Sequence, residues 1–163
     1  MQRVTPSFEV REVRIEDAGQ ILTLQRAAFV SEAQIYGDPD MPALTQTLEQ
    51  LEAELADNLG CVATDGDRVV GALRAVQQHD LLLIGRIATA PDRGGEGIAS
   101  ALLDDVEARA RALGCAVAEL FTGSRSETNV SLYLDRGYVE AERIDQGDGT
   151  SQIFLRKNLE PRR

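Results

Sequence analysis

The stretch LLLIGRIATAPDRGGEGIAS, residues 81–100, joins an apolar run to a glycine-rich turn and the start of a helix. Leu81 to Ala90 has the composition of a buried central strand. After the turn, apolar residues recur at helical spacing, and Gly114 marks the end of the helix. The positions that share this apolar face are Ile98, Leu102, Val106, Ala110 and Leu113. The stretch therefore predicts a strand, a turn and a long helix in succession.

The turn Gly94-Gly95-Glu96-Gly97 contains three glycines just before the helix. Glycines carry no side chain, so backbone N–H groups there can approach an anion closely, and the helix N-terminus adds about half a positive charge. Arg93 lies beside the turn and can pair with a phosphate. The turn has the chemistry of a pyrophosphate cradle, although a simple connection between strand and helix can have the same composition.

Upstream of this stretch, the first part of the chain predicts a strand, a helix and a loop. Phe8 to Arg14 begins with the alternation of a strand, and residues 18–29 repeat at helical spacing. The segment from Val30 to Pro42 has one glycine, two prolines and no clear period, so we expect a loop there.

A second helix and a hairpin follow. Leucines at every third or fourth position mark one face of a helix over residues 44–55, and Thr47 and Gln50 match a capping box. Two short apolar runs at residues 61–64 and 69–76 flank an Asp-Gly pair, which is a strong hairpin signal.

Downstream of the long helix, the pattern predicts a strand, a short helix and two more strands. Cys115 to Phe121 is the strand, and Ser124 with Glu127 matches the capping box of a short helix that Gly137 ends. The final strands are expected at residues 139–144 and 151–155.

The order of these elements predicts a mixed α/β fold. Consecutive hairpins favour a mostly antiparallel central sheet of about six to seven strands, and the strand–helix–strand unit over residues 81–121 implies one parallel crossover. Helices are expected on both faces. We expect a single domain over residues 1–163, with a core of about residues 8–158.

Composition limits the classes of partner. The chain has 17 basic and 27 acidic residues and a formal net charge of −10. Such a charge disfavours nucleic-acid binding and attracts cationic molecules or basic peptides, although it also serves solubility alone. No apolar stretch approaches the about 20 residues of a membrane helix, and Met1 to Ser7 lacks a signal-peptide pattern, so we expect no membrane partner and a cytoplasmic location.

The glycine-rich turn can also be compared with two nucleotide-binding motifs. A phosphate-binding Walker loop requires Gly-Lys-Ser/Thr, which is missing. A dinucleotide fingerprint requires three glycines, and Ser100 occupies the third position after Gly95 and Gly97. Glu119, about 20 residues on, keeps the dinucleotide interpretation open. The hairpins that follow and the interior position of Glu119 in its strand disfavour it.

Two segments resemble the GNAT acetyltransferase superfamily. Arg86 to Ala99 resembles the family's strand, proline and Arg/Gln-Gly-x-Gly-Ile-Gly/Ala cradle, and Ser126 to Tyr138 resembles its Asn-x-x-Ala-x-x-Leu-Tyr-x-x-x-Gly-Phe motif. Gly94 stands where the family has Arg or Gln, with Arg93 one position earlier. Ser126 stands where the family has Asn, with Asn129 one helical turn later.

The resemblance implies an N-acetyltransferase in which a primary amine of a small molecule or peptide attacks acetyl-CoA directly, without a metal. It implies that backbone groups of Ile87, Ala88 and Thr89 pair with pantetheine, and that an N–H near Ala88 polarises the thioester. Further coenzyme-binding residues implied by the two motifs are Arg93, Gly94, Gly95, Gly97, Ile98, Ala99, Ser126 and Asn129.

Tyr133 is the implied general acid, because a tyrosine pKa of about 10 lies just above that of a thiol. Tyr133 also shares a helix face with Val130 and Leu134, so an ordinary core tyrosine is the alternative. Cys61 and Cys115 lie in apolar runs without a neighbouring base, so we expect them to be buried rather than to carry an acyl group.

The general base stays open, because the predicted central strand contains no carboxylate. Candidates elsewhere are Glu32, Asp38 and His79. Arg86 is unusual in an apolar run and either faces a cleft or lies at an edge with a solvated head.

The acceptor is expected near the Val30 to Pro42 loop. Acids there can hold a cation and Tyr36 can stack on it, although a solvated loop is the alternative. The acids meant are Glu32, Asp38 and Asp40.

The sequence is also compatible with two functions other than catalysis of amine acetylation. One is a non-catalytic acyl-CoA sensor, because the predicted central strand lacks a carboxylate. The other is a dinucleotide-binding protein. The sequence does not fix the oligomeric state, although a homodimer is the commonest assembly.

Overall fold

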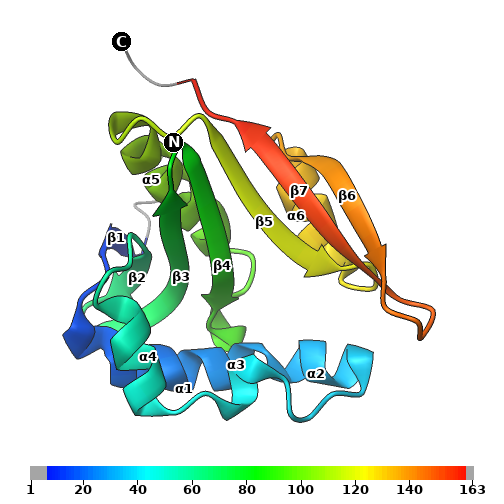
Figure 1. The fold of residues 1–163 in the computed structure, drawn as a ribbon. Helices are drawn as coiled ribbons and strands as arrows, with labels where there is room; N and C mark the ends of the chain where they lie inside the picture. Colours follow the sequence, from blue (N-terminus) through cyan, green and yellow to red (C-terminus); the bar gives the residue numbers. More distant parts are fainter. Residues whose placement is uncertain (1–6, 161–163) are drawn as a thin grey trace, which may run out of the picture.

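A single mixed sheet of seven strands organises the chain, and the computed structural model describes residues 7–160 (Figure 1). The strand order is β1-β2-β3-β4-β5-β7-β6. The strands are β1 (Glu9–Glu12), β2 (Cys61–Asp65), β3 (Arg68–Gln78), β4 (Leu81–Thr89), β5 (Val117–Gly123), β6 (Val139–Asp145) and β7 (Ser151–Asn158).

The helices flank this sheet. They are α1 (Ala18–Ala28), α2 (Val30–Tyr36), α3 (Pro42–Thr45), α4 (Leu48–Leu55), α5 (Ile98–Ala112) and α6 (Glu127–Asp135), with 3-10 turns η1 (Ile15–Asp17) and η2 (Pro91–Arg93). Figure 1 shows α5 and α6 behind the sheet, whereas α1 to α4 gather near its lower end. Both α1 and α5 pack on β3 and β4, so helices cover both faces of the sheet.

The sheet topology confirms the predicted fold class. Every neighbouring pair of strands is antiparallel except β4 with β5, which is the predicted crossover. Four positions of the predicted apolar face of α5 are buried, namely Ile98, Leu102, Val106 and Ala110. The fifth, Leu113, lies just after the helix and is 51% exposed. The capping box of α4 is present as predicted, because Gln50 N donates to Thr47 Oγ1 at 3.2 Å and Thr47 N donates to Gln50 Oε1 at 3.0 Å.

The N-terminal half departs from the sequence prediction in two helices. The expected loop from Val30 to Pro42 begins with helix α2, which ends at Gly37 in a left-handed conformation. The expected helix over residues 44–55 is divided into α3 and α4, because Gln46 and Thr47 are extended.

The bounds of two further elements also differ from the sequence prediction. The first strand is shorter than predicted and covers Glu9–Glu12. The predicted capping box of Ser124 and Glu127 is wrong, because α6 begins after Ser126, whose side chain makes no capping hydrogen bond. The Ser124 hydroxyl accepts a hydrogen bond from Ser151 N at 2.8 Å instead. Ser124 therefore links the loop between β5 and α6 to the start of β7.

Within residues 7–160, no helix combines the length and the apolar character that crossing a bilayer requires.

Candidate functional site

The two central strands separate partway along the sheet. The parallel ladder pairs Leu81 to Leu83 with Val117 to Glu119 and stops there among the described residues. Figure 1 shows β4 and β5 closest at their first residues and moving apart along their length. The second half of β4 is therefore hydrogen-bonded only on its β3 side.

Backbone alternation decides which groups of β4 face this opening. Ala90 N donates to Val70 O on β3 at 2.9 Å, and Ala88 lies opposite Ala72 in the same ladder. Successive residues of a strand direct their N–H and C=O groups to opposite sides. The backbone groups of Ile87 and Thr89 therefore point into the opening, whereas those of Ala88 point toward β3.

A β-bulge kinks β4 beside the opening. Arg74 lies opposite Gly85 and Ala72 opposite Ala88, so two residues of β4 face one residue of β3. Arg86, in the bulge, has a φ of 52°, a left-handed conformation that arginine seldom adopts. The bulge re-aims the strand next to a cavity.

That cavity has a volume of about 510 Å³ and lies where β4 and β5 diverge. Its walls come from α2, the segment that leads into α3, the middle of β4, the end of β5, α6 and β7. Five of its lining residues carry ionisable side chains that the sequence indicated as candidates: Glu32, Tyr36, Asp38, Arg86 and Tyr133. His79 lies elsewhere, in the β3–β4 turn, and Asp40 does not line the cavity.

Tyr133 is almost buried, with 6% of its surface exposed, yet it lines the cavity. Burial, together with the negative charge of Glu32, raises the pKa of its hydroxyl above the usual value. The hydroxyl therefore stays protonated at neutral pH. The sequence offered a general acid and an ordinary core tyrosine as alternatives for Tyr133. Its position has features of both, because this core residue also faces the cavity.

A hydrogen-bonded network ties α2 to the start of α6. Ser126 Oγ donates to Glu32 Oε2 at 2.6 Å and lies 2.7 Å from Tyr36 Oη, while Asn129 Nδ2 donates to Glu32 Oε1 at 3.3 Å. The Tyr36 hydroxyl also packs against Gly123, where a Cβ atom would lie 2.0 Å from it. Ser126 and Asn129 thus contact α2, a partnership that the sequence did not reveal.

The glycine-rich turn before α5 is open, as a cradle must be. Gly95 and Gly97 both have a φ of 79°, and a Cβ atom built at either position would meet nothing within 4 Å. The first helical backbone bond joins Ala101 N to Gly97 O at 3.0 Å. The N–H groups of Ile98 and Ala99 precede that bond and are available to an anion, so the turn fits a diphosphate.

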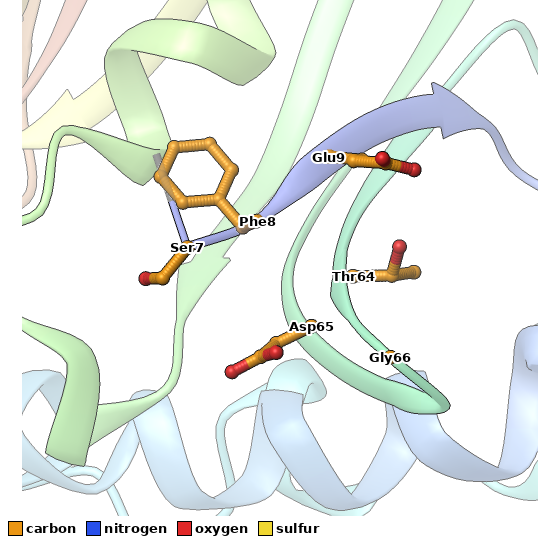
Figure 2. Close-up of a pocket in the computed structure, with 6 residues that line it drawn as sticks. All are labelled: Ser7, Phe8, Glu9, Thr64, Asp65 and Gly66. Carbon is orange, nitrogen blue, oxygen red and sulfur yellow. The ribbon is translucent and has the colours of Figure 1, made fainter. Parts of the chain in front are cut away.

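The side chain of Arg93, by contrast, forms hydrogen bonds to other residues of the protein. Its guanidinium donates to Glu96 at 2.6 Å, to Asp65 at 2.8 Å and to Ser7 Oγ at 2.7 Å. Ser7 and Asp65 line a hollow of about 400 Å³ where β1 begins and β2 ends. Figure 2 shows the two side chains pointing to the same side. This hollow adjoins the ion pairs that hold the turn rather than the open cavity.

Neither cysteine reaches the cavity. Both Cys61 and Cys115 are fully buried, as predicted. Burial raises the pKa of the Cys61 thiol to about 12 and also raises that of Cys115. Such thiols are poor nucleophiles at neutral pH. Among the described residues, no group of three or more His, Cys, Asp or Glu side chains is placed to hold a metal ion.

Comparison with protein families gives a match over residues 20–138 to the model of the acetyltransferase (GNAT) family. The chain belongs to this family. GNAT membership confirms the resemblance read from the two motifs, and it decides against the dinucleotide-binding alternative.

A curated relative of this GNAT protein is the UPF0157 protein YqkA of Bacillus subtilis, 27% identical over 135 residues. The match covers 81% of this chain and 37% of the relative. The chain therefore spans well under half the length of that protein.

Solved structures share the fold at low sequence identity. The PaiA N-acetyltransferase of Thermoplasma acidophilum, in complex with coenzyme A, has a TM-score of 0.77 at 18% identity and covers 93% of this chain and 98% of its own. The ribosomal-protein-S18-alanine N-acetyltransferase of Escherichia coli has a TM-score of 0.77 at 15% identity and covers 93% and 94%.

Proposed function

We propose that this GNAT protein transfers the acetyl group of acetyl-CoA to a primary amine bound in the 510 Å³ cavity. The observation that carries the proposal is the cavity's position. It lies where β4 leaves β5, and it brings together an open strand edge, the buried hydroxyl of Tyr133 and the carboxylates of Glu32 and Asp38. Acetyl-CoA supplies the acetyl group as an activated thioester.

The coenzyme would be held by backbone groups at two places. The N–H groups of Gly95, Gly97, Ile98 and Ala99 suit its diphosphate, and the outward-facing groups of Ile87 and Thr89 suit an extended pantetheine chain. The alternation of β4 moves the proposed polarising N–H from Ala88 to Ile87. Gly94 adds no side chain to the start of the turn.

The side chains of Arg93, Ser126 and Asn129 were expected to contact the coenzyme. In this proposal they instead hold other groups of the site in position. Arg93 fixes the shape of the turn through Asp65 and Glu96. Ser126 and Asn129 fix Glu32 on α2. Each of the three therefore positions a group that contacts a substrate.

Tyr133 and Glu32 divide the proton transfers. Glu32 takes the proton that the amine loses as its nitrogen bonds to the acetyl carbon. Tyr133 supplies the proton that the sulfur gains as the carbon–sulfur bond breaks. The raised pKa of Tyr133 keeps its proton in place until negative charge develops on the sulfur.

A transfer assay over a panel of primary amines tests the proposal, with release of free thiol as the signal. Coenzyme binding is measured separately by thermal shift, since a ligand at 100 times its dissociation constant stabilises a protein by about 2.7 kcal/mol. Acetylation of at least one amine supports the proposal.

The same assay tests the sensor alternative, which is favoured by the lack of a carboxylate on β4. Binding of acetyl-CoA without turnover of any amine would establish the sensor. Absence of binding would contradict both.

A further inference from the structure

Arg86 brings a positive charge into the wall of the proposed acceptor cavity. Its side chain lines the cavity and is only partly exposed. No hydrogen bond or ion pair joins it to any residue between 7 and 160. A guanidinium that is partly removed from water and lacks an anion is unfavourable unless a ligand supplies one.

A second arginine lies on the neighbouring strand β3, opposite the residue that precedes Arg86. Arg74, opposite Gly85 on β3, is 6% exposed, and its Nη1 atom is buried without a hydrogen-bond partner in the described structure. Burial, together with the charge of Arg86, lowers the pKa of Arg74 to about 10. Burial likewise lowers the pKa of Arg86.

The protein supplies one nearby carboxylate for these two cations. Glu54 Oε2 lies 3.0 Å from Arg74 Nε, and the Glu54 side chain is 45% exposed. The other groups that contact the Arg74 guanidinium are the uncharged amides of Gln25 and Gln46. The two guanidiniums and Glu54 together carry an excess of one positive charge. Arg86 presents this charge to the cavity, whereas Glu32 and Asp38 line the cavity on the α2 side.

We propose that the acceptor is an amino acid, bound with its carboxylate on Arg86 and its amine toward Glu32. This assignment rests on the proposed function, because it orients the amine toward the carboxylate that takes its proton. Arginine suits a carboxylate because its planar fork can form two parallel hydrogen bonds. The cavity is charged with opposite signs at its two sides, which matches a bipolar molecule better than a simple cation.

Matched acceptors test this assignment. Each amino acid is compared with its carboxamide, which keeps the amine and side chain but lacks the negative charge, and with a phosphate-bearing amine. We expect kcat/KM for the acid to exceed that for the carboxamide by about 10- to 100-fold. A preference for the phosphate-bearing amine, or equal rates on acid and carboxamide, would overturn the assignment.

The variant Arg86→Gly removes the guanidinium and suits the left-handed φ of 52°. It should abolish the preference for the acid, because the rate on the acid falls by more than the rate on the carboxamide, and Arg86→Lys should retain part of the preference. Arg143→Gln, on the exposed strand β6, is the matched control and should leave both rates unchanged. Equal loss of both rates in a folded Arg86→Gly protein would contradict the role.

Binding distinguishes failure of this inference from failure of the proposed function. If no amine is acetylated, the proposed function fails. Thermal shift by the amino acid and by its carboxamide, in the presence of coenzyme A, still tests Arg86. Stabilisation by the acid alone, lost in Arg86→Gly, supports the assignment, whereas equal shifts or no shift with either compound overturns it.

Discussion

Two neighbouring tyrosines have different surroundings, although their rings are only 6.2 Å apart. Tyr133 lines the cavity, whereas Tyr138 is 1% exposed and donates a hydrogen bond to Glu107 at 2.9 Å. Tyr133→Phe should lower turnover by about 10²-fold and leave coenzyme affinity nearly unchanged, because it removes a proton donor without removing the ring. Steady-state kinetics and thermal shift measure the two quantities.

Tyr138→Phe is the matched control for that experiment. It removes a structural hydrogen bond and should lower the melting temperature while turnover of the folded enzyme is retained. Unchanged turnover in Tyr133→Phe would remove Tyr133 from the mechanism.

Asp17 is a second residue whose environment makes a measurable prediction. Burial alone would raise the pKa of its carboxyl, but hydrogen bonds from Arg11 at 2.8 Å and from Arg14 N at 2.8 Å hold it below the ordinary value of 3.8. A depressed pKa contributes stability above the ordinary pKa, and this contribution is lost as pH falls through the folded-state pKa.

Asp17→Asn should therefore destabilise the protein at neutral pH and remove this part of its acid sensitivity. The difference in unfolding free energy between the two proteins should shrink as pH falls below about 4. Urea titrations between pH 2 and pH 7 measure it. A difference that stays constant with pH would contradict the role of the Arg11 pair.

At the scale of elements, close contact between α5 and the sheet sets the position of the cradle. A Cβ atom at Gly71 of β3 would lie 2.4 Å from Ile98 Cγ2, in the first turn of α5. Gly71→Ala should push α5 outward, cost about 1–3 kcal/mol of stability and weaken coenzyme binding. Chemical unfolding and thermal shift with coenzyme A measure the two effects.

Gly19 offers the opposite control within helix α1. A Cβ atom there would meet nothing within 4 Å, so Gly19→Ala should stabilise the protein by about 0.5–1 kcal/mol. Coenzyme affinity that is unchanged in Gly71→Ala would separate the cradle from the packing of α5.

Local sequence signals were sufficient to predict some of the helices and strands, but not α2. The hairpin, α4 and α5 carry turn residues, a capping box and a regular apolar face. Helix α2 has seven residues, and no residue within it is buried. Its Glu32 and Tyr36 side chains contact Ser126, 94 and 90 positions away. A helix fixed by such distant partners leaves no periodic signal in its own segment.

The sequence indicated only those parts of the candidate site that lie in contiguous motifs. Tyr133 and the cradle belong to contiguous motifs, so their positions could be read from the sequence. The left-handed conformation of Arg86 arises from the pairing of β4 with β3, and arginine itself does not favour it. The contact between Arg93 and Asp65 joins residues 28 positions apart, which spacing along the chain does not reveal.

At the scale of the whole molecule, a buried ion pair connects the two parts of the sheet. Glu107 of α5 is 1% exposed and accepts hydrogen bonds from Lys157 of β7 at 2.7 Å and from Tyr138. This ion pair adds a connection between the two parts of the sheet, which the short ladder between β4 and β5 also joins. Lys157→Met should cost about 3–5 kcal/mol, because it leaves the buried carboxylate without its nearest cation.

The double variant Lys157→Met with Glu107→Gln provides the comparison. Removing both charges should recover part of the stability that the single variant loses, since no unpaired charge stays buried. Chemical unfolding of the four proteins measures the coupling. Additive losses would show that the pair does not connect the two parts.

The divergence of β4 from β5 also has a consequence for handling the protein. It leaves exposed backbone donors and acceptors on facing strand edges, and such edges can recruit a strand from another molecule. Coenzyme bound along β4 would cap that edge. Ligand-free protein should therefore scatter more light at high concentration than coenzyme-saturated protein. Added salt, which screens the net charge of −10, should widen the difference.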